Sequence, residues 1–149
     1  MATRSTIALE FADGTVQQVY AHWDGYLENN GMILYKHYSD PFKLRDLIDL
    51  GDISSLAADI GSQHGFDARD EGTTFYGRDR GETGCAATKF ANFEDYKANH
   101  QYEEFEYILR LVDGVATWFV SQYGKAYLPL ADALAEHLRE RAEEETLAA

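Results

Sequence analysis

The 149-residue chain has a single cysteine and few prolines, and both shortages limit what the protein can be. One cysteine, Cys85, cannot form an internal disulfide framework or a zinc site of several cysteines, which fits a reducing compartment. No base can be paired with Cys85 from the sequence, so we treat it as a structural thiol rather than a nucleophile. No proline-rich or serine-rich linker divides the chain, and we expect a single domain over residues 1–149.

Long apolar runs are also missing. No stretch approaches the ~20 residues that a membrane-spanning helix needs. The first residues have neither the basic segment nor the apolar stretch of a signal peptide. We therefore expect a protein that stays in the cytoplasm where it is made.

Basic residues are scarce, since 13 Lys and Arg stand against 26 Asp and Glu, a net charge of −13. Such a charge repels phosphate backbones and anionic lipids, which argues against direct binding to nucleic acid or to a membrane. Two explanations of the acidic surface remain open: solubility alone, or electrostatic attraction to a partner protein with a basic surface.

The motifs that identify enzymes and metal proteins are absent as well. The chain has no Gly-x-Ser-x-Gly elbow, no dinucleotide fingerprint and no Gly-x-x-x-x-Gly-Lys phosphate loop. It has no His-Glu-x-x-His motif and no histidine pair four residues apart; the histidines are His22, His37, His64, His100 and His137. Carboxylates are so abundant that no pair stands out as acid and base. The sequence therefore predicts no catalytic residue, metal or cofactor, and it favours a protein that is not an enzyme.

What is present is a clear alternation of apolar and polar residues in two places, typical of half-buried strands. Each alternation meets an Asp-Gly pair, which best tolerates positive φ at both centres of a type I′ hairpin turn. Strands are predicted at residues 5–11 and 15–23, joined by Asp13-Gly14, and at 104–112 and 115–121, joined by Asp113-Gly114. We expect these four strands to form one antiparallel sheet.

Helices are predicted between the hairpins and at the end of the chain, which makes the fold class α+β. The strongest runs over 41–50, with Asp40 as N-cap, proline at the first helical position and Gly51 at the C-terminal cap. Others are predicted at 32–38, at 53–60 behind Asp52, and from Asn92 to about 99. Leu130, Leu134 and Leu138 recur at a spacing of four and predict an amphipathic terminal helix whose end, over 140–149, frays.

Residues 61–87 read as a long connection crossing one end of the sheet, with Phe75-Tyr76 as a strand-like core. Connections of this length are often functional loops, and a mobile excursion is the alternative.

Two clusters are candidate ligand-binding sites. The first is Tyr20, His22, Trp23, Asp24 and Tyr26, where aromatic faces for stacking accompany a histidine and a carboxylate for hydrogen bonds. The alternative is a sheet edge with Trp23 in the core and a turn at Asp24-Gly25.

The second cluster is a glycine-flanked loop with Arg78, Arg80 and Glu82, whose guanidinium groups could grip a phosphate or carboxylate. Alternatively, the arginines form local ion pairs with Asp79 and Glu82. If the two clusters converge, they form an aromatic floor beside a cationic rim for an anionic ring compound such as a nucleotide.

Candidate partner-binding residues are acidic side chains on the polar face of a strand and of the terminal helix: Glu103, Glu104, Glu106, Glu136 and Glu140. The partner that they fit best is a protein with a basic surface.

Four blocks of the sequence resemble a family of small uncharacterised proteins of tailed bacteriophages and prophages: residues 3–7 (TRSTI), 19–26 (VYAHWDGY), 50–56 (LGDISSL) and 76–83 (YGRDRGET). In the family pattern position 21 is a cysteine, whereas Ala21 stands here, which argues against a thiol nucleophile at that position. The resemblance implies a cytoplasmic protein of an infected bacterium, where small phage proteins often bind host machinery.

We therefore expect a non-enzymatic binding protein that inhibits a host defence system, for example a CRISPR effector or a restriction enzyme, through its acidic surface. The second hypothesis is a small-ligand binding protein that sequesters a nucleotide immune signal. A small hydrolase or transferase is the third.

Overall fold

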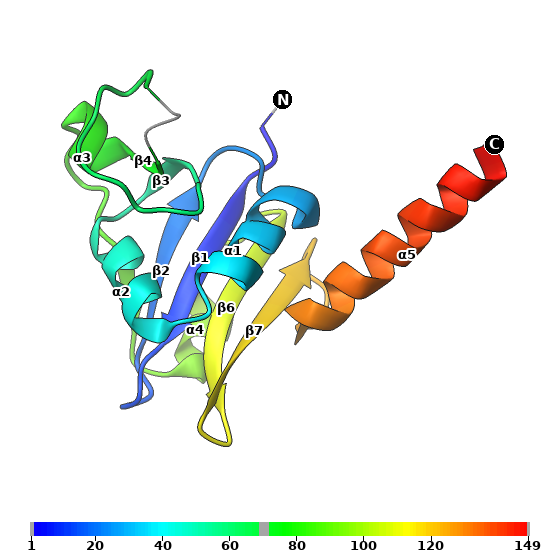
Figure 1. The fold of residues 1–149 in the computed structure, drawn as a ribbon. Coiled ribbons are helices and arrows are strands. Elements are labelled where there is room, and N and C mark those ends of the chain that lie inside the picture. The colour runs from blue at the N-terminus through cyan, green and yellow to red at the C-terminus, as the bar shows by residue number, and fades with distance from the viewer. Residues whose placement is uncertain (1, 69–71, 149) are drawn as a thin grey trace.

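The structure of the chain is a computed structural model that describes residues 2–68 and 72–148. Its elements follow one another as β1 (Ser5–Glu10), β2 (Val16–Ala21), a short π-helix η1 (Leu27–Gly31), α1 (Met32–His37), α2 (Pro41–Asp49), β3 (Ile53–Ser55), β4 (Thr74–Phe75), α3 (Tyr76–Arg80), β5 (Thr88–Phe90), α4 (Phe93–Asn99), β6 (Phe105–Val112), β7 (Val115–Gln122), β8 (Leu128–Pro129) and α5 (Leu130–Ala148). The predicted α+β class with a C-terminal helix is confirmed (Figure 1).

The strands form one sheet in the order β4-β3-β2-β1-β6-β7-β8, and β5 pairs separately with β2. Both predicted hairpins are confirmed, because β1 pairs antiparallel with β2 and β6 pairs antiparallel with β7. The prediction of an antiparallel sheet is wrong at its centre, where β1 and β6 run parallel. The long helical connection between the hairpins returns the chain to the end of the sheet where β1 began, as parallel pairing requires.

The two hairpin turns differ in their backbone. Asp113 and Gly114 both have positive φ, 51° and 79°, as a type I′ turn requires. In the first hairpin only Gly14 does, at 92°. There the Asp13 carboxylate accepts hydrogen bonds from the Thr15 backbone and hydroxyl, which holds a longer loop in place.

Each face of the sheet has its own apolar cluster. One face presents Ile7, Leu9, Val19, Tyr107 and Leu109 to α1, α2 and the start of α5, and this is the main core. The opposite face packs a smaller cluster against β5 and α4: Ala8, Val16, Phe90, Tyr96 and Ile108. Alternate residues of β6 therefore point into different clusters, which places Glu106 under α4 and not in solvent.

Most predicted helices are confirmed. Asp40 accepts a hydrogen bond from the Phe42 backbone and caps α2, and Asn92 caps α4 through the Asp95 backbone. The helix predicted at 53–60 is wrong, because residues 53–55 form β3 at the free edge of β2. Asp52 accepts a hydrogen bond from the Tyr20 backbone at 2.9 Å and thus ties this edge together rather than capping a helix.

The predicted 61–87 connection contains β4 and α3, and Tyr76 begins the helix instead of extending the strand. Residues 69–71 of this connection lie outside the described residues. At the other end of the chain, α5 extends well away from the body (Figure 1). Leu130 and Leu134 are buried but Leu138 is 53% exposed, so the predicted leucine stripe is only partly covered.

Candidate functional site

The aromatic cluster at the end of β2 brings His22 into contact with both Tyr20 and Trp23. The Tyr20 hydroxyl and Nδ1 of His22 lie 2.7 Å apart, so these side chains share a face. Trp23 meets the His22 ring edge-on with centroids 4.7 Å apart, and Asp24 and Tyr26 are exposed in the turn that follows. Burial raises the pKa of Tyr20, which therefore stays a neutral phenol at neutral pH.

The Arg78 guanidinium is engaged within the protein, which favours local pairing over the predicted ligand binding. Its guanidinium donates hydrogen bonds to the backbone carbonyls of Ile60, Gly61 and Thr73 and to the Asp79 carboxylate. The same group lies 4.6 Å from the centre of the Phe75 ring. Arg78 is a cross-link that holds the connection to β4.

Arg80 forms the local ion pair that was the alternative prediction. Its Nε lies 2.5 Å from the Glu82 carboxylate, and both side chains are roughly half exposed. The guanidinium also lies 5.1 Å from the centre of the Tyr76 ring. The backbone N–H groups of Tyr76 and Tyr20 both donate to Asp52, so the loop and the aromatic cluster lie at the same edge of the sheet.

Cys85 lies beside this end of the sheet without the features of a nucleophile. Burial and the nearby charges of Asp52 and Glu82 raise the pKa of its thiol. A protonated thiol is the unreactive form, so the site offers no activated sulfur.

The predicted partner-binding glutamates differ in their exposure and in their contacts. Glu103 and Glu104 are half-buried beside β6, where Glu104 accepts a weak hydrogen bond from the Arg4 backbone. Glu136 pairs with Arg139 on the surface of α5, and Glu140 is exposed. Glu106 is only 1% exposed and therefore presents almost no surface to a partner, contrary to what its predicted role requires.

Glu106 instead forms a buried ion pair with His100, which the sequence did not identify. Nε2 of His100 faces the Glu106 carboxylate, and Nδ1 lies 2.6 Å from the Tyr96 carbonyl oxygen. Both nitrogens face acceptors, an arrangement that favours the doubly protonated imidazolium. Burial alone would lower the pKa of His100, but the hydrogen bond and charge of Glu106 outweigh it and raise this pKa.

Tyrosine rings enclose this pair. Tyr96 stacks on the His100 ring at 4.5 Å, and Tyr102 covers the ring from 4.4 Å. The Tyr127 hydroxyl donates to that of Tyr96, and burial raises the pKa of Tyr127 to about 12. One sign of the pair was present in the sequence: Glu106 shares its face of the strand with the apolar Ile108 and follows a histidine by six residues.

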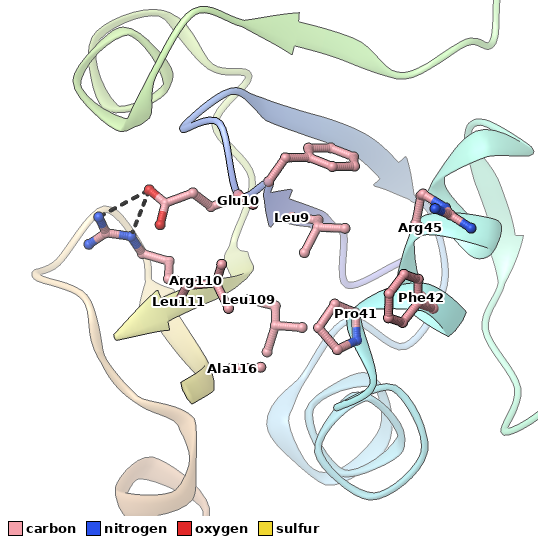
Figure 2. A pocket seen from close by; sticks show the side chains of 11 residues that line it. Leu9, Glu10, Pro41, Phe42, Arg45, Leu109, Arg110, Leu111 and Ala116 are labelled. Atoms are coloured by element: carbon pink, nitrogen blue, oxygen red, sulfur yellow. Dashed lines mark hydrogen bonds and ion pairs between the residues drawn. The ribbon is translucent and has the colours of Figure 1, made fainter. Parts of the chain in front are cut away.

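Two cavities remain as candidate ligand sites. The first, about 280 Å³, lies between the start of α2 and the ends of β1, β6 and β7. Figure 2 shows Pro41 and Phe42 facing Leu109 across it, while Arg110 pairs with Glu10 at its margin. Its walls are almost entirely apolar, so they define no chemical class of ligand.

The second cavity, about 270 Å³, lies beside the His100–Glu106 pair and is bounded by the turn between β7 and β8. It combines charged, hydroxyl and aromatic groups, and these make it the better defined site.

Other classes of site lack the required groups. Within the described ranges, 2–68 and 72–148, no cluster of three His, Cys, Asp or Glu side chains could hold a metal ion. None of the helices in this part of the chain is both long and apolar enough to cross a membrane.

Comparisons of the chain with protein-family models, with curated proteins and with solved structures gave no match.

Proposed function

We propose that the protein is a non-enzymatic binding protein, made by a bacteriophage in the host cytoplasm, that inhibits a bacterial defence system by docking acidic side chains on a basic partner. The observation that carries the proposal is the outer half of α5, a charged helix that extends beyond the fold and whose glutamates form no ion pair within the described residues.

The inner half of α5 is well attached. Leu134 is buried in the main core, and Glu28 of η1 pairs with His137 and Arg141, each at 2.7 Å. Beyond Arg141, no hydrogen bond or ion pair joins α5 to the rest of the described chain. The outer half of α5 therefore receives no stabilisation from such contacts with the rest of the fold. An isolated helix of this length is only marginally stable in water.

The charges of the outer half also oppose the helix. Glu140 lies three and four positions from Glu143 and Glu144, a spacing at which like charges repel. Glu143, Glu144 and Glu145 approach the C-terminal end, where the helix dipole disfavours negative charge, and no basic residue stands in the last turn. A row of carboxylates that costs the helix stability is explained if a cationic partner neutralises it.

The resemblance to phage proteins supports a host target, and the net charge of −13 supports a basic one. Enzymes that cut foreign nucleic acid carry basic channels, and a carboxylate-rich helix can occupy such a channel in place of a phosphate backbone. Inhibition of this kind requires no catalytic residue.

A plaque assay tests the proposal. The protein is expressed in bacterial strains that each carry one defence system, including CRISPR effectors and restriction enzymes, and the strains are infected with a sensitive phage. We expect the wild-type protein to restore plaques in at least one strain. The variant E140Q/E143Q/E144Q should lose this effect, because its helix keeps its shape without the three charges.

The matched control is D46N/D49N/E94Q, which removes the same charge from exposed positions outside α5. It should restore plaques as the wild type does. Failure of the wild type in every strain would overturn the proposal, and equal loss in both variants would assign the effect to net charge rather than to α5.

The second hypothesis, capture of a nucleotide between the aromatic cluster and the arginine loop, has less support. It needs free guanidinium groups, whereas Arg78 is bonded internally and Arg80 is paired with Glu82. If the protein binds a nucleotide, another part of the molecule must do so.

A further inference from the structure

The cavity of about 270 Å³ beside the buried ion pair offers three kinds of contact in a small space. It lies between the last turn of α4, the segment that follows it and the turn from β7 to β8. Its main lining residues are His100, Tyr102, Glu106, Ser121, Lys125 and Tyr127. Known ligand pockets begin at roughly 300 Å³, so the volume suits a small molecule rather than a polymer.

The floor of the cavity is a carboxylate with acceptor capacity left over. Glu106 is only 1% exposed, and one of its oxygens is engaged by His100. The carboxylate lines the cavity, and a carboxylate can accept several hydrogen bonds, so an N–H group of a ligand can donate to it. Because His100 already balances the charge, a neutral donor suffices.

The mouth of the cavity supplies a positive charge. Lys125 is exposed in the turn after β7, and its ammonium forms no ion pair within the described residues. Ser121 holds this turn by donating to the Lys125 carbonyl at 2.6 Å. Lys97 lines the opposite side and pairs with Glu94 at the surface, a contact that contributes little and breaks readily.

Aromatic rings form the walls. Tyr102 is 62% exposed although it covers His100, and Tyr127 lines the far side. An exposed tyrosine held over a histidine presents a flat face on which a planar ring can stack.

We propose that this cavity binds a nucleoside monophosphate: the base stacks on Tyr102, an N–H of the base donates to Glu106, and the phosphate meets Lys125. The net charge of −13 does not prevent this. Charges farther away than the screening length, about 8 Å at physiological ionic strength, are largely screened, so a small anion responds mainly to the nearest lysines. A long nucleic acid would also meet the acidic surface outside the cavity.

Isothermal titration calorimetry of the purified protein tests the proposal, with AMP, CMP, GMP, UMP and inorganic phosphate as separate probes. We expect at least one nucleotide to bind with measurable heat and phosphate alone to bind at least about tenfold more weakly, since it lacks the stacked base. Lys125→Ala and Tyr102→Ala should each weaken nucleotide binding about tenfold or more. Both residues are exposed, so the fold should tolerate the changes.

Lys89→Ala and Tyr35→Ala are the matched controls, because both residues are exposed and lie outside the cavity lining. They should bind as the wild type does. Absence of binding for all four nucleotides at millimolar concentration would overturn the proposal, as would phosphate binding as tightly as the nucleotides or equal losses in the controls. A single-stranded oligonucleotide that binds more tightly than the mononucleotides would also overturn it. This measurement is independent of the plaque assay on α5.

Discussion

Replacing Glu106 with leucine should reveal the energy held in the buried ion pair. The substitution leaves the His100 imidazolium without its counter-charge at a side chain that is 2% exposed. Breaking a buried pair by removing one partner typically costs about 3–5 kcal/mol, because the remaining charge is desolvated and uncompensated. For a domain of this size each kcal/mol lowers Tm by about 2–4 °C, so the melting temperature should fall by roughly 6–20 °C.

The loss should depend on pH in a definite direction. The pKa of His100 is raised in the folded protein. Because the pKa of His100 is higher in the folded than in the unfolded protein, the ion pair adds its full stabilising free energy below the pKa of an unfolded histidine, about 6.5. This stabilisation is lost as the pH rises through the pKa of His100 in the folded protein. The Glu106→Leu variant should therefore differ most from the wild type near pH 6 and least at alkaline pH, where His100 is neutral in both.

Urea unfolding followed by tryptophan fluorescence measures the free energy of unfolding of the wild type and of the Glu106→Leu variant at pH 6 and pH 9. The double variant His100→Phe/Glu106→Leu removes both charges and should recover much of the stability, since apolar pairs often replace buried ion pairs without loss. A loss below about 1 kcal/mol at pH 6, or an equal loss at both pH values, would refute the assignment of a charged pair.

Three further predictions follow from other contacts. Arg78→Ala should destabilise the fold by about 2–3 kcal/mol in the same urea assay, because Arg78 bonds to three backbone carbonyls, including that of the buried Thr73. Arg80→Ala should cost under about 1 kcal/mol, because Arg80 pairs with Glu82 at the surface, and equal losses would contradict this. Gly51→Ala should lower the free energy of unfolding by about 1–3 kcal/mol, because φ is +86° and the new Cβ would lie 2.3 Å from the Cys85 carbonyl oxygen. Gly65→Ala should lower it little, because a Cβ at Gly65 would meet open space. Affinity for the basic partner, measured by calorimetry, should fall about tenfold or more from low to physiological salt, and an affinity independent of salt would contradict an electrostatic interface.

The parts of the fold that the sequence predicted are those fixed by neighbouring residues. Asp113-Gly114 and the alternation around it determine a hairpin without reference to the rest of the chain, and Asp40 with Pro41 does the same for the start of α2. The helix expected behind Asp52 failed because a more distant partner, the free edge of β2, was available to residues 53–55. A capping signal depends only on neighbouring residues, so it gives no information about a strand edge elsewhere in the fold.

The candidate site was harder to predict because its contacts join residues far apart. Arg78 bonds to carbonyls 17 and 18 positions earlier, so a loop that resembled an anion grip serves as a cross-link. Glu106 looked like a surface carboxylate because its strand alternates, but α4 covers that face of the sheet. Alternation predicts that successive side chains point to opposite faces, and it leaves open which face is covered.

Some charged residues of this molecule are needed for the stability of the fold, and others are not. Arg78 and Asp79 satisfy each other and the surrounding backbone, so the fold accounts for them completely. The glutamates of the outer α5 are different, because like charges at this spacing repel and each costs stability where a neutral residue would serve better. A partner's cations would remove that cost on binding. Binding energy of that kind is available only to the complex, so the outer α5 is where a partner has most to gain.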